Sequence, residues 1–144
     1  MSRSGVVIGL DIGAVRIGVA RGDLAVKVAS PRPALANNDQ IWQNLKQLTE
    51  SNHAETIVVG LPRDAEGLET AQSKISRDFA TKLSEAVSVP VILQDESLTS
   101  IAAERNLRAR KDFREQMLRD GTLDSEAATL ILTDYLEGDQ HDTA

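Results

Sequence analysis

A short segment near the start of the chain places the tightest limit on what it can fold into. The apolar run over residues 6–10 predicts a buried strand, and Asp11 stands at its carboxyl end. Gly13 and a second apolar run over 16–20 follow at once, which predicts a tight turn and a returning strand. A carboxylate beside a buried strand is costly unless a cation, phosphate or basic partner compensates for its charge. Asp11 is therefore either a ligand-binding acid or the residue that starts an ordinary turn.

Glycines interrupt this segment at three places. Gly9, Gly13 and Gly18 have no side chain, so the backbone there can pass close to a ligand or adopt φ values that a Cβ forbids. We expect at least part of this glycine pattern to serve a binding site.

The rest of the chain alternates between strand and helix patterns. The first three predicted strands follow one another without a helix between them, so they form an antiparallel meander, while helices precede the last two. Ile75, Phe79 and Leu83 mark the predicted buried face of one helix. The sequence predicts an α/β fold with a mixed five-stranded sheet flanked by helices, in one domain over residues 1–138, with 139–144 as a disordered tail. The further predicted strands cover about 25–29, 56–61 and 89–93, and the predicted helices cover 39–52, 68–87, 98–110 and 124–137.

The composition narrows the possible chemistry. The chain has no cysteine, which excludes disulfides and thiolate zinc sites and fits a reducing, cytoplasmic location. His53 and His141 are its two histidines, which argues against a Ser-His-Asp triad or a histidine metal site. No apolar run reaches membrane-spanning length, and five residues precede Val6, so we expect neither a membrane partner nor a secretory signal. Catalysis would rest on carboxylates, hydroxyls, lysine or arginine.

Further acids stand at the ends of predicted elements. Asp95 and Glu96 follow the last strand, at the edge of the sheet where α/β proteins bind ligands. Neighbouring strand residues face opposite sides, so at most one of these two shares a face with Asp11. Asp124 shares the apolar face of the last helix, where two small alanines allow close packing on the sheet. Asp124 is therefore a helix cap or an inward member of a polar site.

Three inward carboxylates would repel one another when ionised. A divalent cation resolves this conflict, and oxygen ligands favour Mg²⁺ or Mn²⁺ over zinc. Two such ions close together can activate a water and stabilise the leaving oxygen in phosphodiester hydrolysis.

Basic residues gather in one stretch of an acidic chain. The net charge is −6, yet six of the sixteen basic residues fall within 105–119. This stretch is either a solvated helix face or a mobile cationic arm that holds a polyanion beside the acidic site. The residues that we predict to contact nucleic acid are Arg16, Arg108, Arg110, Lys111 and Arg114.

Four sequence blocks together resemble the YqgF/RuvX family of RNase H-like nucleases. They are Gly9-Leu-Asp11-Ile-Gly13 with Arg16-Ile-Gly-Val-Ala20, Val58-Val-Gly-Leu-Pro62 with Gly67, Asp95-Glu96-Ser97-Leu98-Thr99-Ser100, and Asp124-Ser-Glu-Ala-Ala128 with Ile131-Leu132 and Tyr135-Leu136. The blocks come in the family's order and extend over residues 5–137. Ser97 departs from the pattern, because the family usually has an arginine there.

The resemblance implies an RNase H-like fold and a metal-dependent nuclease site of Asp11, Glu96 and Asp124, loaded with Mg²⁺ or Mn²⁺. It also implies a bacterial, cytosolic protein, a monomer or homodimer, that acts on structured RNA or branched DNA. The two implied roles are maturation of the 5′ end of 16S rRNA and resolution of Holliday junctions. Ser97 puts in question a cationic contact near the site.

Two other interpretations remain open at this point. An Asp-x-Gly turn between strands also opens the fold of sugar kinases and actin-like ATPases, but that fold needs two domains and 144 residues leave no room for them. The other interpretation is an RNase H-like scaffold without catalytic activity that assists ribosome assembly or transcription.

Overall fold

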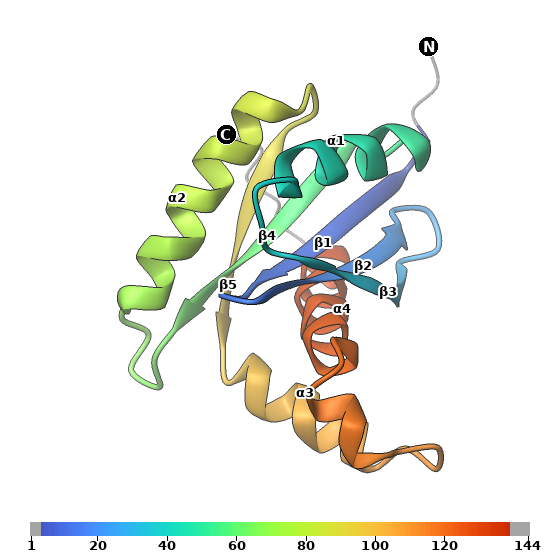
Figure 1. Cartoon of the computed structure of the whole chain (residues 1–144), viewed down its shortest axis with the longest axis vertical. Helices are drawn as coiled ribbons and strands as arrows, with labels where there is room; N and C mark the ends of the chain where they lie inside the picture. Colours follow the sequence, from blue (N-terminus) through green and yellow to red (C-terminus); the bar gives the residue numbers. More distant parts are fainter. Residues whose placement is uncertain (1–3, 139–144) are drawn as a thin grey trace.

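A mixed five-stranded sheet organises the fold (Figure 1). The computed structural model describes residues 4–138, so the predicted tail at 139–144 lies outside the described residues. Within 4–138, no helix is long and apolar enough to cross a membrane. The strands are β1 (Val6–Ile12), β2 (Arg16–Asp23), β3 (Val28–Ala36), β4 (Thr56–Arg63) and β5 (Val91–Ser97). The helices are α1 (Ile41–Ser51), α2 (Ala71–Ala86), α3 (Thr99–Arg108), the short 3₁₀ helix η1 (Glu115–Leu118) and α4 (Thr122–Glu137).

The sheet has the predicted topology. Its strand order is β3-β2-β1-β4-β5, with antiparallel pairing among the first three strands and parallel pairing of β1 with β4 and of β4 with β5. The parallel strands end at one edge, and β5 leads directly from this edge into α3 (Figure 1). The predicted mixed sheet is confirmed.

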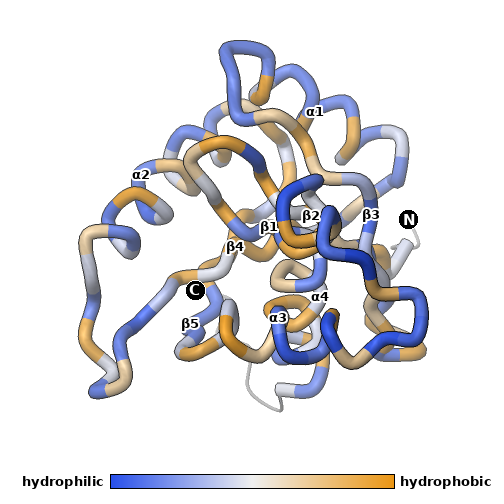
Figure 2. The backbone as a smooth tube through the Cα atoms, turned by 60° about the horizontal axis from the view of Figure 1, so that its bottom comes forward, coloured by the Kyte–Doolittle hydropathy of each residue, from blue (hydrophilic) through white to orange (hydrophobic). Residues whose placement is uncertain are grey.

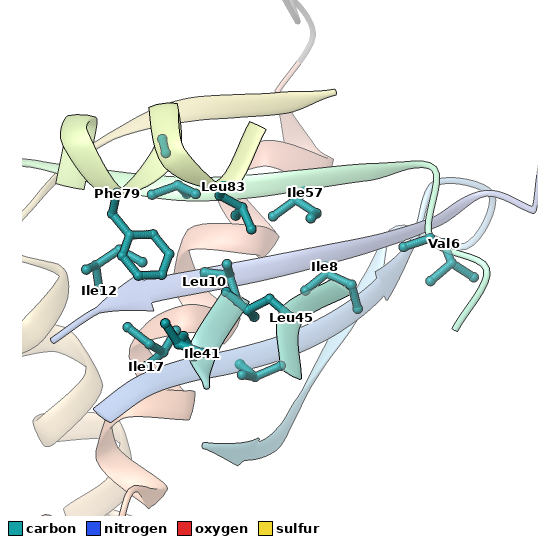
Figure 3. Packing of buried hydrophobic residues seen from close by; sticks show 14 residues of the cluster. Val6, Ile8, Leu10, Ile12, Ile17, Ile41, Leu45, Ile57, Phe79 and Leu83 are labelled. Atoms are coloured by element: carbon teal, nitrogen blue, oxygen red, sulfur yellow. The ribbon is translucent and has the colours of Figure 1, made fainter. Parts of the chain in front are cut away.

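Each face of the sheet has its own helix layer. Helices α1 and α2 cover one face, where side chains such as Ile8, Leu10 and Phe79 form the larger buried cluster (Figure 3). Helix α4 covers the other face, where Leu132 packs with Val58. Each fully buried side chain of this size contributes about 1.5–3 kcal/mol, so both layers add substantially to stability.

Helix α4 lies unusually close to the sheet because glycines stand beneath it. A Cβ built on Gly18 would lie 1.9 Å from the backbone oxygen of Asp124, and one on Gly9 would lie 2.8 Å from the Cβ of Leu132. The expected close approach exists, but its partner is α4 rather than a ligand. Neither glycine has a positive φ, so it is close packing and not an unusual φ that requires glycine at these two positions.

The third strand differs from its prediction. It covers Val28–Ala36 instead of 25–29, and it includes Pro31 and Pro33. A proline lacks the N–H that a central strand must donate, but β3 is an edge strand and tolerates it. Because proline is unusual within strands, the sequence of this segment did not predict one.

The buried face of α2 also differs from its prediction. Ile75 is 54% exposed, whereas Ser73 and Ser76 are buried. Ser73 faces inward because its hydroxyl donates to the carbonyl of Pro62 and accepts the N–H of Thr70, which caps the helix. The other two predicted residues of this face are buried as expected. Figure 2 shows hydrophilic and hydrophobic residues alternating along α1 and α2, as expected of helices with one buried side.

Candidate active site

Asp11 lies near the end of β1, on the sheet face that α4 covers. It pairs in register with Gly18 of β2, and Gly18 packs against the backbone of Asp124 at the start of α4. The contact between Gly18 and α4 thus brings two predicted site acids together. Burial, and then the charge of Asp124, raise the pKa of Asp11 from 3.8 to about 6.

Asp124 lies in the first turn of α4, and its side chain is 30% exposed. Its carboxylate accepts a hydrogen bond from Nε of Arg16 at 3.2 Å. The next residue, Ser125, fixes this end of the helix, because its buried hydroxyl accepts the N–H of Val19 at 3.1 Å. Asp124 is thus a polar group at the helix–sheet boundary, as its place on the apolar helix face indicated.

Glu96 comes from the end of β5, which runs from Val91 to Ser97 and so extends beyond the predicted range of 89–93. Its Oε2 accepts the hydroxyl of Thr99 at 3.2 Å, while its Oε1 is buried and has no hydrogen-bond partner in the described part of the chain. Burial, and next the neighbouring carboxyl of Asp134 on α4, raise the pKa of Glu96 to about 9. The hydrogen bond from Thr99 acts in the opposite direction and lowers this pKa.

Asp95 lies on the opposite side of β5. Its carboxylate forms an ion pair with Nε of Arg63 at 3.0 Å, whereas Glu96 lines a cavity with Asp11. The alternation rule allowed only one of the two acids to face Asp11, and the structure places Glu96 there.

A cavity of about 220 Å³ opens between these acids at the carboxyl edge of β4 and β5. Asp11 and Glu96 are its acidic lining residues, and Arg63 is its cationic one; Asp124 is not among the residues that line it. Arg63 pairs in register with Ser97, the position where the family pattern has an arginine. A cation is therefore present beside the cavity, although it comes from β4.

The acids suit a hard divalent cation in their chemistry. All the candidate ligands are carboxylate oxygens, burial and then Asp124 destabilise the Asp11 anion, and Glu96 has a buried oxygen without a donor. They come as two pairs, Asp11 with Asp124 and Glu96 with Asp134. Within residues 4–138, no three acidic or histidine side chains are close enough to hold one ion. The predicted three-acid metal site therefore stays a prediction.

The predicted basic residues fall into two groups. Arg16 and Arg110 form ion pairs with acids of α4, Arg16 with Asp124 and Arg110 with Glu126 at 2.8 Å. Arg110 also pairs with Asp112, and Arg108 pairs with Glu104 at 3.1 Å. The second group is Lys111 and Arg114, which are exposed and form no ion pair among residues 4–138.

Sequence reasoning missed three residues around the site. Asp134 does not belong to the apolar face of α4 that Asp124 shares, and nothing in the sequence placed it opposite Glu96. Thr99 and Arg63 contact the two acids at the end of β5, yet both look like ordinary polar residues at element ends. For Thr99 a signal existed, since a hydroxyl three residues after a strand acid can reach back to it.

The chain resembles known proteins along nearly its whole length. The sequence model of the RuvX family, described as Holliday junction resolvase, matches residues 5–138. A Synechocystis protein named "Putative pre-16S rRNA nuclease" is 35% identical over 139 residues, which cover 95% of this chain and 90% of that protein. A Coxiella burnetii protein of the same name is 37% identical over 136 residues, 92% of each chain.

Solved structures share the fold. The chain superimposes on RuvC of T. thermophilus in complex with a Holliday junction substrate with a TM-score of 0.52, at 15% identity, over 91% of this chain and 92% of that one. The fowlpox virus Holliday junction resolvase gives a TM-score of 0.51, also at 15% identity, over 92% and 98%. The fold is thus that of RuvC-like, RNase H-like resolvases. By the extent of the sequence match, the chain belongs to the RuvX family.

Proposed function

We propose that this protein is a metal-dependent nuclease that processes the 5′ end of pre-16S rRNA. Membership of the RuvX family makes it a nuclease, a hydrolase of phosphodiester bonds. Its relatives at 34–37% identity carry the name of a pre-16S rRNA nuclease, which favours this RNA as the substrate. One observation of the structure carries the proposal: Asp11 and Glu96 line one cavity at the sheet edge, with Asp124 beside Asp11.

The residues of this cavity have distinct roles in the proposal. The carboxylate oxygens of Asp11, Glu96 and Asp124 would hold Mg²⁺ or Mn²⁺. A bound divalent ion supplies an activated water and charge stabilisation for the leaving oxygen. Thr99 orients Glu96 through its 3.2 Å hydrogen bond, and Arg63 at the cavity wall adds positive charge near the scissile phosphate.

The raised pKa values of Asp11 and Glu96 support cation binding at the two acid pairs. The raised pKa values of Asp11 and Glu96 mean that, without a cation, ionisation at this edge is disfavoured. A bound cation favours the charged carboxylates, so loading releases protons. Cleavage that is metal-dependent and rises with pH through the neutral range is the expected result.

Holliday junction resolution is the second candidate activity. The family description and the fold shared with two Holliday junction resolvases favour it. We place the activity in the cytoplasm, in a monomer or a homodimer. The sugar-kinase alternative is dropped, because the sequence model of the RuvX family matches residues 5–138.

The two substrates are compared directly. Purified protein is incubated with Mg²⁺, Mn²⁺ or EDTA, and with either a 5′-extended 16S rRNA precursor or a four-way DNA junction, and products are mapped on gels. We expect metal-dependent trimming of the RNA. Cleavage of the junction alone would favour the resolvase, and no cleavage of either with any metal would support the non-catalytic scaffold.

Matched carboxylate-to-amide variants test the site. Asp11→Asn and Glu96→Gln are expected to lower cleavage by at least about a hundredfold, the usual size of the loss for an essential charge-stabilising group. Asp95→Asn is the comparison and is expected to lose far less activity than Glu96→Gln, because Asp95 does not line the cavity and reaches it only through its ion pair with Arg63. If Asp95→Asn abolished cleavage and Glu96→Gln did not, the assignment of Glu96 to the site would be wrong.

A further inference from the structure

One face of α3 lies next to the acidic cavity at the edge of the sheet. Within α3, Ile101, Arg105 and Arg108 stand at intervals of four and three, which places them along one side of the helix. Leu98, the residue before the helix, belongs to the same surface because it lines one cavity with Ile101. Leu98 is 58% exposed and Ile101 is 65% exposed. This face, here called the α3 face, thus presents apolar side chains at the end near the acids and arginines at the far end.

Leu98 has an uncommon backbone conformation. Its φ is 59° and its ψ is 16°, in the left-handed region that side chains other than Asn and Asp rarely adopt. Such conformations concentrate at ligand-binding positions, where the surrounding structure maintains them. Here the strained residue is a large apolar one whose side chain is left in solvent directly after the strand that carries Glu96.

The α3 face is continuous with the acidic cavity. Leu98, Ser100 and Ile101 line the cavity that Asp11 and Glu96 also line. Ser100 and Ile101 border a second, more open hollow of about 480 Å³ as well, which extends to the two arginines of the α3 face. A ligand strand that leaves the acids can therefore pass Ile101 and reach the arginines along one continuous surface.

At the arginine end, one of the two guanidinium groups has no acid partner among the described residues, although Glu104 also lines the hollow. Arg108 pairs with Glu104 and Glu115 and lies 5.6 Å above the ring of Phe113. Arg105 is exposed, and no ion pair or hydrogen bond involves its guanidinium among residues 4–138. A free guanidinium beyond two exposed apolar side chains is complementary to one ligand chemistry in particular, a nucleobase with a broad apolar face joined to an anionic phosphate.

We propose that the α3 face binds an unpaired nucleotide next to the scissile bond, with its base on Leu98 and Ile101 and a flanking phosphate on Arg105. This inference rests on the proposed nuclease function and specifies its substrate: the cleaved strand must offer an unstacked base beside the cut. A fully paired duplex keeps its bases stacked and cannot make the apolar contact without first being opened. The enzyme then selects for single-stranded ends or branch points over uninterrupted duplex.

The test is a binding measurement on two probes of one sequence. The first is an RNA hairpin with a single-stranded 5′ extension whose first unpaired base is 2-aminopurine, and the second is its fully paired counterpart. Binding is measured by fluorescence in the Asp11→Asn background, which leaves the probes uncut. We expect stronger binding of the unpaired probe, together with a change in 2-aminopurine emission.

The variants are chosen to preserve the backbone. Leu98→Asn keeps a residue that tolerates the left-handed conformation, and Ile101→Gln keeps a helix former. Together they are expected to weaken binding of the unpaired probe about tenfold, because an aliphatic side chain no longer covers the base, with little effect on the paired probe. Arg105→Gln is expected to weaken both and to lower the salt slope by about 0.7–0.9. The controls are Ile75→Gln and Lys46→Gln, which change equivalent exposed side chains on α2 and α1.

Three outcomes overturn the inference. The Leu98→Asn/Ile101→Gln variant loses affinity equally for both probes, Ile75→Gln loses as much affinity for the unpaired probe as that double variant, or the double variant loses none. If that double variant binds both probes normally but changes the sedimentation of the protein, the α3 face contacts protein instead and the inference is wrong. Cleavage by the wild type reports on the proposed function separately. A protein that discriminates the probes through α3 but cuts no substrate refutes the nuclease proposal, while the binding of an unpaired base by the α3 face still stands.

Discussion

Replacing Asp11 by asparagine is expected to stabilise the metal-free protein at neutral pH. The reason is the cost of the Asp11 charge in the folded state, where burial and then Asp124 raise its pKa from 3.8 to about 6. Asparagine has nearly the same shape and no charge. The variant therefore loses an unfavourable charge along with its proposed catalytic function.

The pKa change gives both the sign and the size of the effect. Because the folded pKa lies above the unfolded one, the folded state binds the proton more tightly, and unfolding releases it between pH 3.8 and about 6. The contribution of Asp11 to stability is thus complete below pH 3.8, falls as pH rises, and is gone above about 6. The change from 3.8 to about 6 corresponds to about 3 kcal/mol, at about 1.4 kcal/mol for each pKa unit.

Urea unfolding in EDTA measures this directly. The single tryptophan, Trp42, is partly buried with its ring 4.7 Å from that of Phe79, so its fluorescence reports on unfolding. At pH 7.5 the Asp11→Asn variant is expected to have a free energy of unfolding up to about 3 kcal/mol above the wild type. At about pH 4 the two proteins are expected to differ little, because Asp11 is then protonated in the folded state.

Glu85→Gln is the matched control, since Glu85 is exposed on α2. Its difference from the wild type is expected to stay small and independent of pH. An Asp11→Asn variant less stable than the wild type at neutral pH, or a difference unchanged between the two pH values, would refute the reasoning. Either result would mean that the charge of Asp11 is compensated in the folded protein.

Two further predictions concern the helix–sheet contact and the basic segment. Gly18→Ala places a Cβ about where the Asp124 backbone oxygen lies, so we expect a decrease of about 3 kcal/mol in the free energy of urea unfolding together with loss of cleavage; unchanged stability would contradict the observed packing. Neutralising Lys111 and Arg114 is expected to lower the salt slope of nucleic-acid binding by about 0.7–0.9 for each phosphate that is no longer neutralised, with thermal stability unchanged. An unchanged slope would make these two residues part of a solvated surface.

Most of the sheet could be predicted because its strands are apolar and its turns carry glycine. Strand alternation reduced Asp95 and Glu96 to a choice between two, and the family resemblance selected Glu96. In the structure, the pairing of β5 with β4 sets which of the two faces Asp11. Strand β3 was misplaced because its position at the sheet edge, which permits proline, depends on long-range pairing. The inward face of α2 was partly wrong because Ser73 and Ser76 are buried by contacts that hydropathy does not register.

The surroundings of the acids were harder to predict than the acids. Asp134 approaches Glu96 only because of how α4 crosses the sheet, and residue spacing does not determine the angle at which a helix crosses. The basic segment was predicted from charge alone. Its ion pairs, such as that of Arg110 with Glu126, join residues from separate elements. The sequence therefore could not show which basic side chains remain unpaired and available to bind a ligand.

The two faces of the sheet separate the candidate chemistry from most of the apolar packing. The acids Asp11, Glu96 and Asp124 all belong to the face with α4, while the larger apolar cluster lies under α1 and α2 on the other side. Substitutions at distant, non-touching positions act almost independently. Sequence drift or protein engineering can therefore change the thermal tolerance of this enzyme through the α1–α2 layer, at buried positions such as Leu45 and Leu83, while the reactive edge keeps its geometry.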